Sequence, residues 1–225
     1  MRILAVDTTT PHGSVAVLEE DRLLAEIGIA SATTHSARLL SSIHFLLESI
    51  GIEIRGIDGF AVTPGPGSFT GIRIGLSTVK SFAFASGRPV AAVPSLRALA
   101  WKFRDFAVLA APMLDAKKGE IYAALFEVSA NGPTEVVPQG AYSPDAFLAL
   151  LPTGRPITII GNGIEICGDK IGVALGPHAR FSLRSPFMAA EVGLLGRAIL
   201  AAGEGVSAEA LEPLYFRKSQ AEDRH

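Results

Sequence analysis

The start of the chain alternates between short apolar runs and turns before it changes to a helical spacing. Arg2 to Val6, Ser14 to Leu18 and Leu23 to Ala30 are rich in β-forming side chains, and turns separate them. These three segments predict the strands of a meander. Between His35 and Ile50 the apolar residues recur at helical intervals, and Gly51 follows where a left-handed C-cap belongs.

A stiff turn leads into the next helix. Ile57 to Thr63 predicts a strand, and Pro64-Gly65-Pro66-Gly67 follows it. Ser68 is a suitable N-cap for a helix that continues to Ser86, and Pro89 to Val93 predicts a further strand. The first 93 residues therefore predict the order β-β-β-α-β-α-β.

The second half of the chain opens like the first. A strand from Val108 to Leu114 ends at Asp115, Lys117-Lys118-Gly119 forms a turn, and Ile121 to Val128 predicts the return strand. This weak internal repeat indicates two related lobes. The further elements predicted after it are a helix at Pro144 to Leu151, a strand at Ile157 to Ile160, a turn at Gly161-Asn162-Gly163 and a helix at Phe187 to Ala202.

The fold class that these patterns predict is α/β, in two lobes. We assign residues 1–105 to the N-terminal lobe and residues 106–225 to the C-terminal lobe, which ends in a polar tail from Glu212.

Composition excludes several classes of protein. The chain is 48% hydrophobic and 19% charged, which suits a well-packed globular protein. Its net charge of −2 and the lack of a Lys/Arg run argue against direct binding of nucleic acid by this chain. A single cysteine, Cys167, excludes an internal disulfide framework. No apolar run reaches membrane-spanning length, and Asp7 interrupts any signal peptide, so we expect a soluble, intracellular protein.

Two aspartates at strand ends are the candidates for a nucleotide or phosphate cleft. Asp7 precedes Thr8 and Thr9, whose hydroxyls could line a phosphate site, and Asp115 ends the equivalent strand of the second lobe. The alternative is an aspartate that only bonds the amides of its own turn. The segment from Gly65 to Gly71 matches neither the P-loop nor the dinucleotide fingerprint, so a stiff turn is the favoured interpretation.

The chain lacks a complete set of catalytic residues. No two histidines stand four apart, no Gly-x-Ser-x-Gly elbow is present, and Cys167 has no base that the sequence reveals. The helix from Ser68 to Ser86 has apolar residues on more than one side, including Ile74, Thr78 and Phe82. Such a helix is either buried in its own domain or covered by a partner protein.

Five blocks of the sequence together resemble the TsaB family, also called YeaZ: ILAVDTTTPHGSVAVL, TPGPGSFTGIRIGLSTVKSFA, AVPSLRALA, MLDAKKGEIYAALF and EPLYFRK. The resemblance implies the two-lobed ASKHA fold of actin, sugar kinases and Hsp70, with RNase H-like lobes, in a cytoplasmic protein. It also implies a role in forming threonylcarbamoyladenosine at position 37 of tRNA. TsaB-like proteins are partners of the catalytic paralogue TsaD and, with the ATPase TsaE, of a larger complex, so this chain would meet tRNA only through the complex.

The resemblance also bears on the metals and cofactors that this chain would bind. TsaD-like chains bind a metal with His-x-x-x-His, whereas Ser95 and Leu99 stand at the matching positions here, so we expect no metal. We expect no cofactor on this chain alone, although ATP or ADP could bind in the complex.

The resemblance further implies which helices meet the partner. The surface that docks on TsaD, or on a second copy when TsaD is absent, is expected to include Leu39, Ile43, Leu46, Leu47, Ile74, Thr78 and Phe82.

The sequence thus predicts a non-catalytic subunit that docks on and activates a TsaD-like enzyme. One alternative is an autonomous ASKHA ATPase or kinase that uses Asp7 and Asp115. The other is a protease that acts on the TsaD paralogue.

Overall fold

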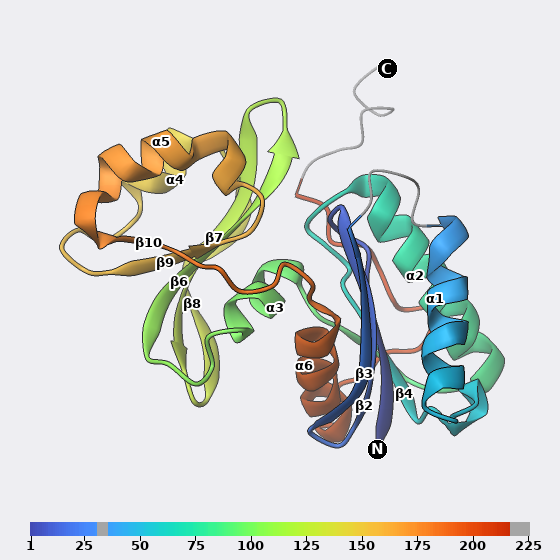
Figure 1. Cartoon of the computed structure of the whole chain (residues 1–225). Helices are drawn as coiled ribbons and strands as arrows, with labels where there is room; N and C mark the ends of the chain where they lie inside the picture. Colours follow the sequence, from blue (N-terminus) through green and yellow to red (C-terminus); the bar gives the residue numbers. More distant parts are fainter. Residues whose placement is uncertain (31–35, 217–225) are drawn as a thin grey trace. The chain divides into compact units, whose positions relative to one another are not determined.

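The computed structural model describes residues 1–30 and 36–216, which form two α/β units with one five-stranded sheet each (Figure 1). The predicted α/β class is confirmed. In chain order, the elements up to the first unit's last strand are β1 (Arg2–Asp7), β2 (His12–Glu19), β3 (Arg22–Ala30), α1 (Ser36–Ser49), η1 (Ile54–Gly56), β4 (Gly59–Val62), α2 (Phe69–Ser86) and β5 (Val90–Ala92). The remaining elements are α3 (Ser95–Trp101), β6 (Val108–Lys117), β7 (Glu120–Ser129), β8 (Gly132–Tyr142), α4 (Pro144–Ala149), β9 (Ile157–Ile160), α5 (Ile164–Leu175), η2 (Gly176–His178), β10 (Ala179–Phe181) and α6 (Ala189–Ala201).

Both sheets have the same strand order, which confirms the internal duplication. The first is β3-β2-β1-β4-β5, and the second, named from the matching edge, is β8-β7-β6-β9-β10. In each sheet the opening strand pairs antiparallel with the next strand and parallel with the fourth strand of its repeat. β1 and β6 are therefore the equivalent central strands.

The alternation of side chains along β1 divides the first unit into layers. Leu4 and Val6 belong to the core cluster that also contains the buried side chains of α1 and α2. Ile3 and Ala5 are equally buried, and they point to the opposite face. Figure 1 shows α1 and α2 on one side of this sheet and α6 on the other. Helices on both faces explain why the central strand is apolar from Ile3 to Val6.

The limits of α1 and α2 follow from their capping residues. The Ser68 hydroxyl accepts a hydrogen bond from the Gly71 N–H at 3.3 Å, as expected of the predicted N-cap, and Gly87 ends α2 in the left-handed conformation. Gly51, with φ of 65°, follows α1. The predicted start of that helix, His35, lies outside the described residues.

Strand residues of the first unit cap α6, the last helix of the chain. The Ser14 hydroxyl of β2 accepts hydrogen bonds from the N–H groups of Met188 and Ala189 at 3.1 and 3.0 Å. Glu26 of β3 accepts another from the N–H of Ala190 at 3.2 Å. These N–H groups have no partner within the helix, so the strands satisfy donors that would otherwise be left unbonded.

The chain therefore divides differently from the predicted boundary at residue 105. The first unit comprises Met1–Ser95 and Phe187–Tyr215, and the second comprises Leu96–Pro186 with Phe216 among the described residues. The predicted polar tail from Glu212 begins inside the first unit, and residues 217–225 lie outside the described part of the chain. An Ala/Leu-rich helix can pack on either sheet, so its own sequence does not reveal which sheet it covers.

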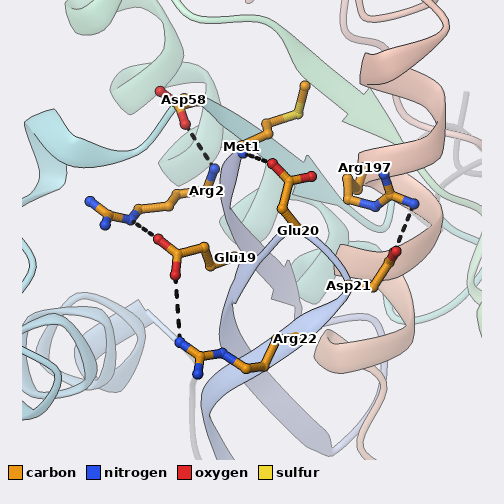
Figure 2. Close-up of polar contacts among 8 residues, drawn as sticks. All are labelled: Met1, Arg2, Glu19, Glu20, Asp21, Arg22, Asp58 and Arg197. Carbon is orange, nitrogen blue, oxygen red and sulfur yellow. Dashed lines mark hydrogen bonds and ion pairs between the residues drawn. The ribbon is translucent and has the colours of Figure 1, made fainter.

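Ion pairs connect the start of β1, the β2–β3 turn and α6 (Figure 2). Arg197 of α6 lies 2.7 Å from Asp21 in that turn. The other contacts join Arg2 to Glu19, Arg22 to Glu19, the Arg2 N–H to Asp58, and the N-terminal ammonium to Glu20. The hydrogen bond and charge of this ammonium lower the pKa of Glu20. Exposed pairs of this kind contribute little stability individually.

A separate core lies against the second sheet. Phe147 of α4 and Ile171 of α5 pack with Met113, Leu125 and Ile159 of the sheet, and all five are fully buried. The predicted strand at Ile157–Ile160 is confirmed as β9.

Close packing of α6 on the first sheet predicts a large effect of one added methyl group. A Cβ on Gly196 would lie 2.4 Å from the Cβ of Ala61 in β4, which requires the backbone to move. Gly196→Ala is expected to reduce the free energy of unfolding by about 1–3 kcal/mol, although alanine favours helix. Urea denaturation measures the change. Gly172→Ala in α5, where no neighbouring atom lies within 4 Å, is the matched control and should be neutral or stabilising. Equal stabilities of the two variants would contradict this packing.

Candidate functional site

Asp7 lies at the end of β1 and is fully buried. Its Oδ1 accepts hydrogen bonds from the Thr9 N–H at 3.0 Å, the Thr9 hydroxyl at 2.7 Å and the Thr63 hydroxyl at 2.6 Å. Thr63 directly follows β4, so the carboxylate joins the ends of two parallel strands. The structure thus places Asp7, Thr8 and Thr9 in an enclosed group of side chains. We call Asp7, Thr8, Thr9 and Thr63 the aspartate cluster.

The first turn of α2 packs directly on the aspartate cluster. The Thr9 carbonyl accepts a hydrogen bond from the Ser68 N–H at 2.7 Å, and the Thr8 hydroxyl donates one to the Gly71 carbonyl at 2.7 Å. A Cβ on Gly71 would lie 1.9 Å from the Thr8 carbonyl oxygen, so no side chain fits there. The glycine therefore lets the backbone of α2 pack directly on the backbone of Thr8. This geometry agrees with a stiff turn and not with a phosphate loop.

Ser95 contacts the same turn from the start of α3. Its hydroxyl donates to the Pro66 carbonyl at 2.6 Å, and its N–H donates to the Gly65 carbonyl at 2.9 Å. Leu99 is buried in α3. Neither residue carries the imidazole nitrogen that a His-x-x-x-His metal site requires.

Asp115 has different surroundings from Asp7. Asp7 comes directly after the last pair of β1 with β4, Val6–Val62, whereas Asp115 comes three residues after the last pair of β6 with β9, Pro112–Ile160. The Asp115 carboxylate is part-exposed and accepts hydrogen bonds from the backbone N–H and the ammonium of Lys117, both at 2.6 Å. Asp115 therefore bonds its own turn.

The Gly161-Asn162-Gly163 turn packs against the end of β6. The Asn162 side-chain oxygen accepts a hydrogen bond from the Asp115 N–H at 3.2 Å, and the Gly163 N–H donates to the Met113 carbonyl at 3.0 Å. A Cβ on Gly161 would lie 2.1 Å from the same carbonyl oxygen. The predicted turn therefore leads directly into α5.

Four residues predicted for a partner interface lie in the core instead. Leu39, Ile43, Leu46 and Leu47 of α1 are buried in the cluster between this helix and the first sheet, with Leu39 only 6% exposed. Their helical spacing places them on the face that covers the sheet of their own unit. The assignment of these four side chains to an exposed partner surface is therefore corrected.

The side chains that α1 and α2 do expose include three large apolar ones. Leu40 and Phe45 of α1 are 56% and 63% exposed, and Phe84 of α2 is 76% exposed. Of the residues predicted on α2, Ile74 and Phe82 pack at the edge of the core and stay partly exposed, as does Thr78. Figure 1 shows both helices on the same side of the sheet. We call Leu40, Phe45, Ile74, Thr78 and Phe84 the outer helix face.

Comparison with known proteins identifies the family of this chain. The family model described as TsaD, tRNA N6-adenosine threonylcarbamoyltransferase, matches residues 26–177. The tRNA threonylcarbamoyladenosine biosynthesis protein TsaB of Bacillus subtilis is 30% identical, over 99% of this chain and 96% of the relative. The chain belongs to the TsaB family.

Other TsaB relatives cover the chain equally well. The TsaB protein of Escherichia coli is 30% identical, over 98% of this chain and 96% of its own length. YeaZ from Pseudomonas aeruginosa is a solved structure with a TM-score of 0.80 and 29% identity, covering 95% of this chain and 99% of that one. The activator of 2-hydroxyisocaproyl-CoA dehydratase from Clostridium difficile has a TM-score of 0.55 at 9% identity, covering 96% of this chain and 100% of that one. This similarity indicates a shared fold and carries no information about function. The fold is thus the predicted ASKHA fold.

None of the helices within residues 1–30 and 36–216 combines the length and the hydropathy needed to cross a bilayer. In the same part of the chain, no group of three His, Cys, Asp or Glu side chains is arranged to hold a metal ion.

The single cysteine of this TsaB-family chain is expected to react slowly. Cys167 is buried in α5, its thiol donates a hydrogen bond to the Gly163 carbonyl at 3.2 Å, and burial raises its pKa. Less thiolate therefore forms at a given pH in the folded state. At pH 8 we expect alkylation of the native protein to be at least about tenfold slower than in denaturant, as measured by mass spectrometry. Equal rates would contradict the burial.

Proposed function

We propose that this chain is the non-catalytic partner subunit of a TsaD-like enzyme, and that the two together modify adenosine 37 of tRNA with threonylcarbamoyl. The biosynthetic role is supported by the names of its relatives in B. subtilis and E. coli. The observation that carries the docking role is the outer helix face. Phe84, Phe45 and Leu40 expose apolar area on two helices of one sheet face, and such area is costly to leave in water.

The surroundings of Ser95 and Leu99 support a role without catalysis by this chain. The Ser95 hydroxyl donates a hydrogen bond to the Pro66 carbonyl, and Leu99 is aliphatic and buried. A metal that polarises a threonylcarbamoyl group needs nitrogen or oxygen ligands with an open position. In the proposal, the TsaD-like subunit supplies that site.

The hydrogen bonds that the two aspartates make within this chain argue against a nucleotide site formed by this chain alone. Asp7 is enclosed by hydroxyls and backbone of its own unit, and Asp115 bonds Lys117. We propose that ATP or ADP is handled by the assembled complex, which includes a TsaE-like ATPase, in the cytoplasm. Steady ATP turnover by the isolated chain would instead favour the alternative of an autonomous ASKHA ATPase or kinase.

Analytical ultracentrifugation of the chain alone and mixed with the TsaD paralogue tests the docking. We expect a stoichiometric complex in the mixture, with both subunits intact afterwards. Two separate sedimenting species at micromolar concentrations would contradict it. Cleavage of the paralogue in the mixture would favour the alternative of a protease.

A further inference from the structure

The C-terminal segment of the first unit packs on the turn that precedes α2. The Leu214 N–H donates to the Pro64 carbonyl at 2.9 Å. A Cβ on Gly65 would lie 2.4 Å from the Leu214 carbonyl oxygen, so the two backbones touch. This contact delivers the next residue, Tyr215, to the first turn of α2.

Tyr215 holds an arginine of α2 in place. Its ring stacks on Phe69 with a centroid separation of 4.8 Å, and the Arg73 guanidinium lies 3.8 Å from the Phe69 ring centroid. The Arg73 Nε–H donates to the Tyr215 hydroxyl at 3.3 Å. Stacking and the Nε bond order the guanidinium while leaving its outer N–H groups unused, because the described part of the chain offers them no other partner.

The charge of α2 indicates what this arginine meets. Arg73 and Lys80 are the charged side chains of α2, which has no acidic residue. Arg73 is exposed and immediately precedes Ile74 of the outer helix face. A planar guanidinium ordered in advance loses little entropy when it binds a carboxylate through two parallel hydrogen bonds.

We infer that Arg73, ordered by Phe69 and Tyr215, is an anchor that binds a carboxylate on the docking face of the TsaD-like subunit. The inference rests on the proposed function and adds the chemistry of the contact. Tyr215 is a positioning residue in this arrangement, because it acts on the partner through Arg73.

Titration of the TsaD paralogue with variants of the full chain tests the anchor. Arg73→Ala is expected to weaken binding by about tenfold or more, mainly through faster dissociation, because a desolvated charge pair is lost. Arg73→Lys should recover less than half of the lost binding free energy, since an ammonium cannot form the two parallel bonds. Tyr215→Phe keeps the ring stack, removes the hydroxyl, and should weaken binding about threefold.

Lys80→Ala is the matched control, because it removes the other cation of α2. It should change affinity by less than about twofold, and binding by Arg73→Ala should depend less on salt than binding by the wild type. If the wild type binds, but Arg73→Ala and Lys80→Ala weaken binding equally, the anchor alone is overturned. Full recovery of binding by Arg73→Lys would also overturn the anchor. A wild-type chain that does not bind the paralogue would overturn the proposed function together with the anchor.

Discussion

Replacing Asp7 with alanine is expected to destabilise the first unit by about 3–5 kcal/mol. Three donors from Thr9 and Thr63 converge on one buried carboxylate oxygen, and alanine leaves them without that acceptor in a site closed to water. For a chain of this size, the melting temperature should fall by roughly 6–20 °C. Thermal unfolding followed by circular dichroism measures the shift.

Asp115→Ala is the control, because it removes the strand-end aspartate of the other repeat. The Asp115 carboxylate bonds an exposed turn, so its loss should cost less than about 1 kcal/mol. Melting of Asp7→Ala within a degree or two of wild type would contradict the structural role of the enclosed aspartate cluster. For the same reason, an ATPase test with Asp7→Ala requires a check that the variant is folded.

Charges on the outer helix face are expected to weaken docking strongly without unfolding the chain. Leu40 and Phe84 are more than half exposed, so Leu40→Glu combined with Phe84→Glu should change stability by less than about 0.5 kcal/mol per site. At the interface, the same carboxylates would be buried in an apolar contact without a partner. We expect the affinity for the TsaD paralogue to fall by at least about a hundredfold. Isothermal titration measures the affinity.

The control for this pair is Val173→Glu in α5. Val173 is 88% exposed and belongs to the second unit, whereas the proposed interface helices belong to the first. It should bind the paralogue like the wild type. If Val173→Glu weakened binding as much as the Leu40/Phe84 pair, the interface would have been assigned to the wrong unit. Leu39→Glu is unsuitable despite its neighbouring position, because it would place a charge in the core.

Local sequence patterns predicted much of the first repeat. The meander, the stiff turn, the Ser68 N-cap and the helix to Ser86 each depend on residues close in sequence, and each is present. The duplication could also be predicted, because the strand–Asp–turn–strand order appears twice. β8 was missed, since Pro133 and Pro138 and an irregular register with β7 hide the pattern of an edge strand.

The α1 side chains of the outer helix face could not be predicted from residue spacing. Leu39 and Leu40 are identical in type and adjacent in sequence, yet one is in the core and the other is exposed. Periodicity shows that an apolar stripe exists, but the sheet beneath α1 determines which side of the helix is covered. The place of α6 and the enclosure of Asp7 likewise depend on contacts between residues far apart in the chain, such as Ser14 with Met188 and Thr63 with Asp7.

The decisive measurement is the rate of threonylcarbamoyl transfer to tRNA by the purified TsaD paralogue, with and without this chain. We expect no transfer by the chain alone, an increased rate when wild-type chain is added to the paralogue, and no increase when the folded Leu40→Glu/Phe84→Glu variant is added. Transfer by the chain alone, or full activation by that variant, would contradict a subunit that acts by docking.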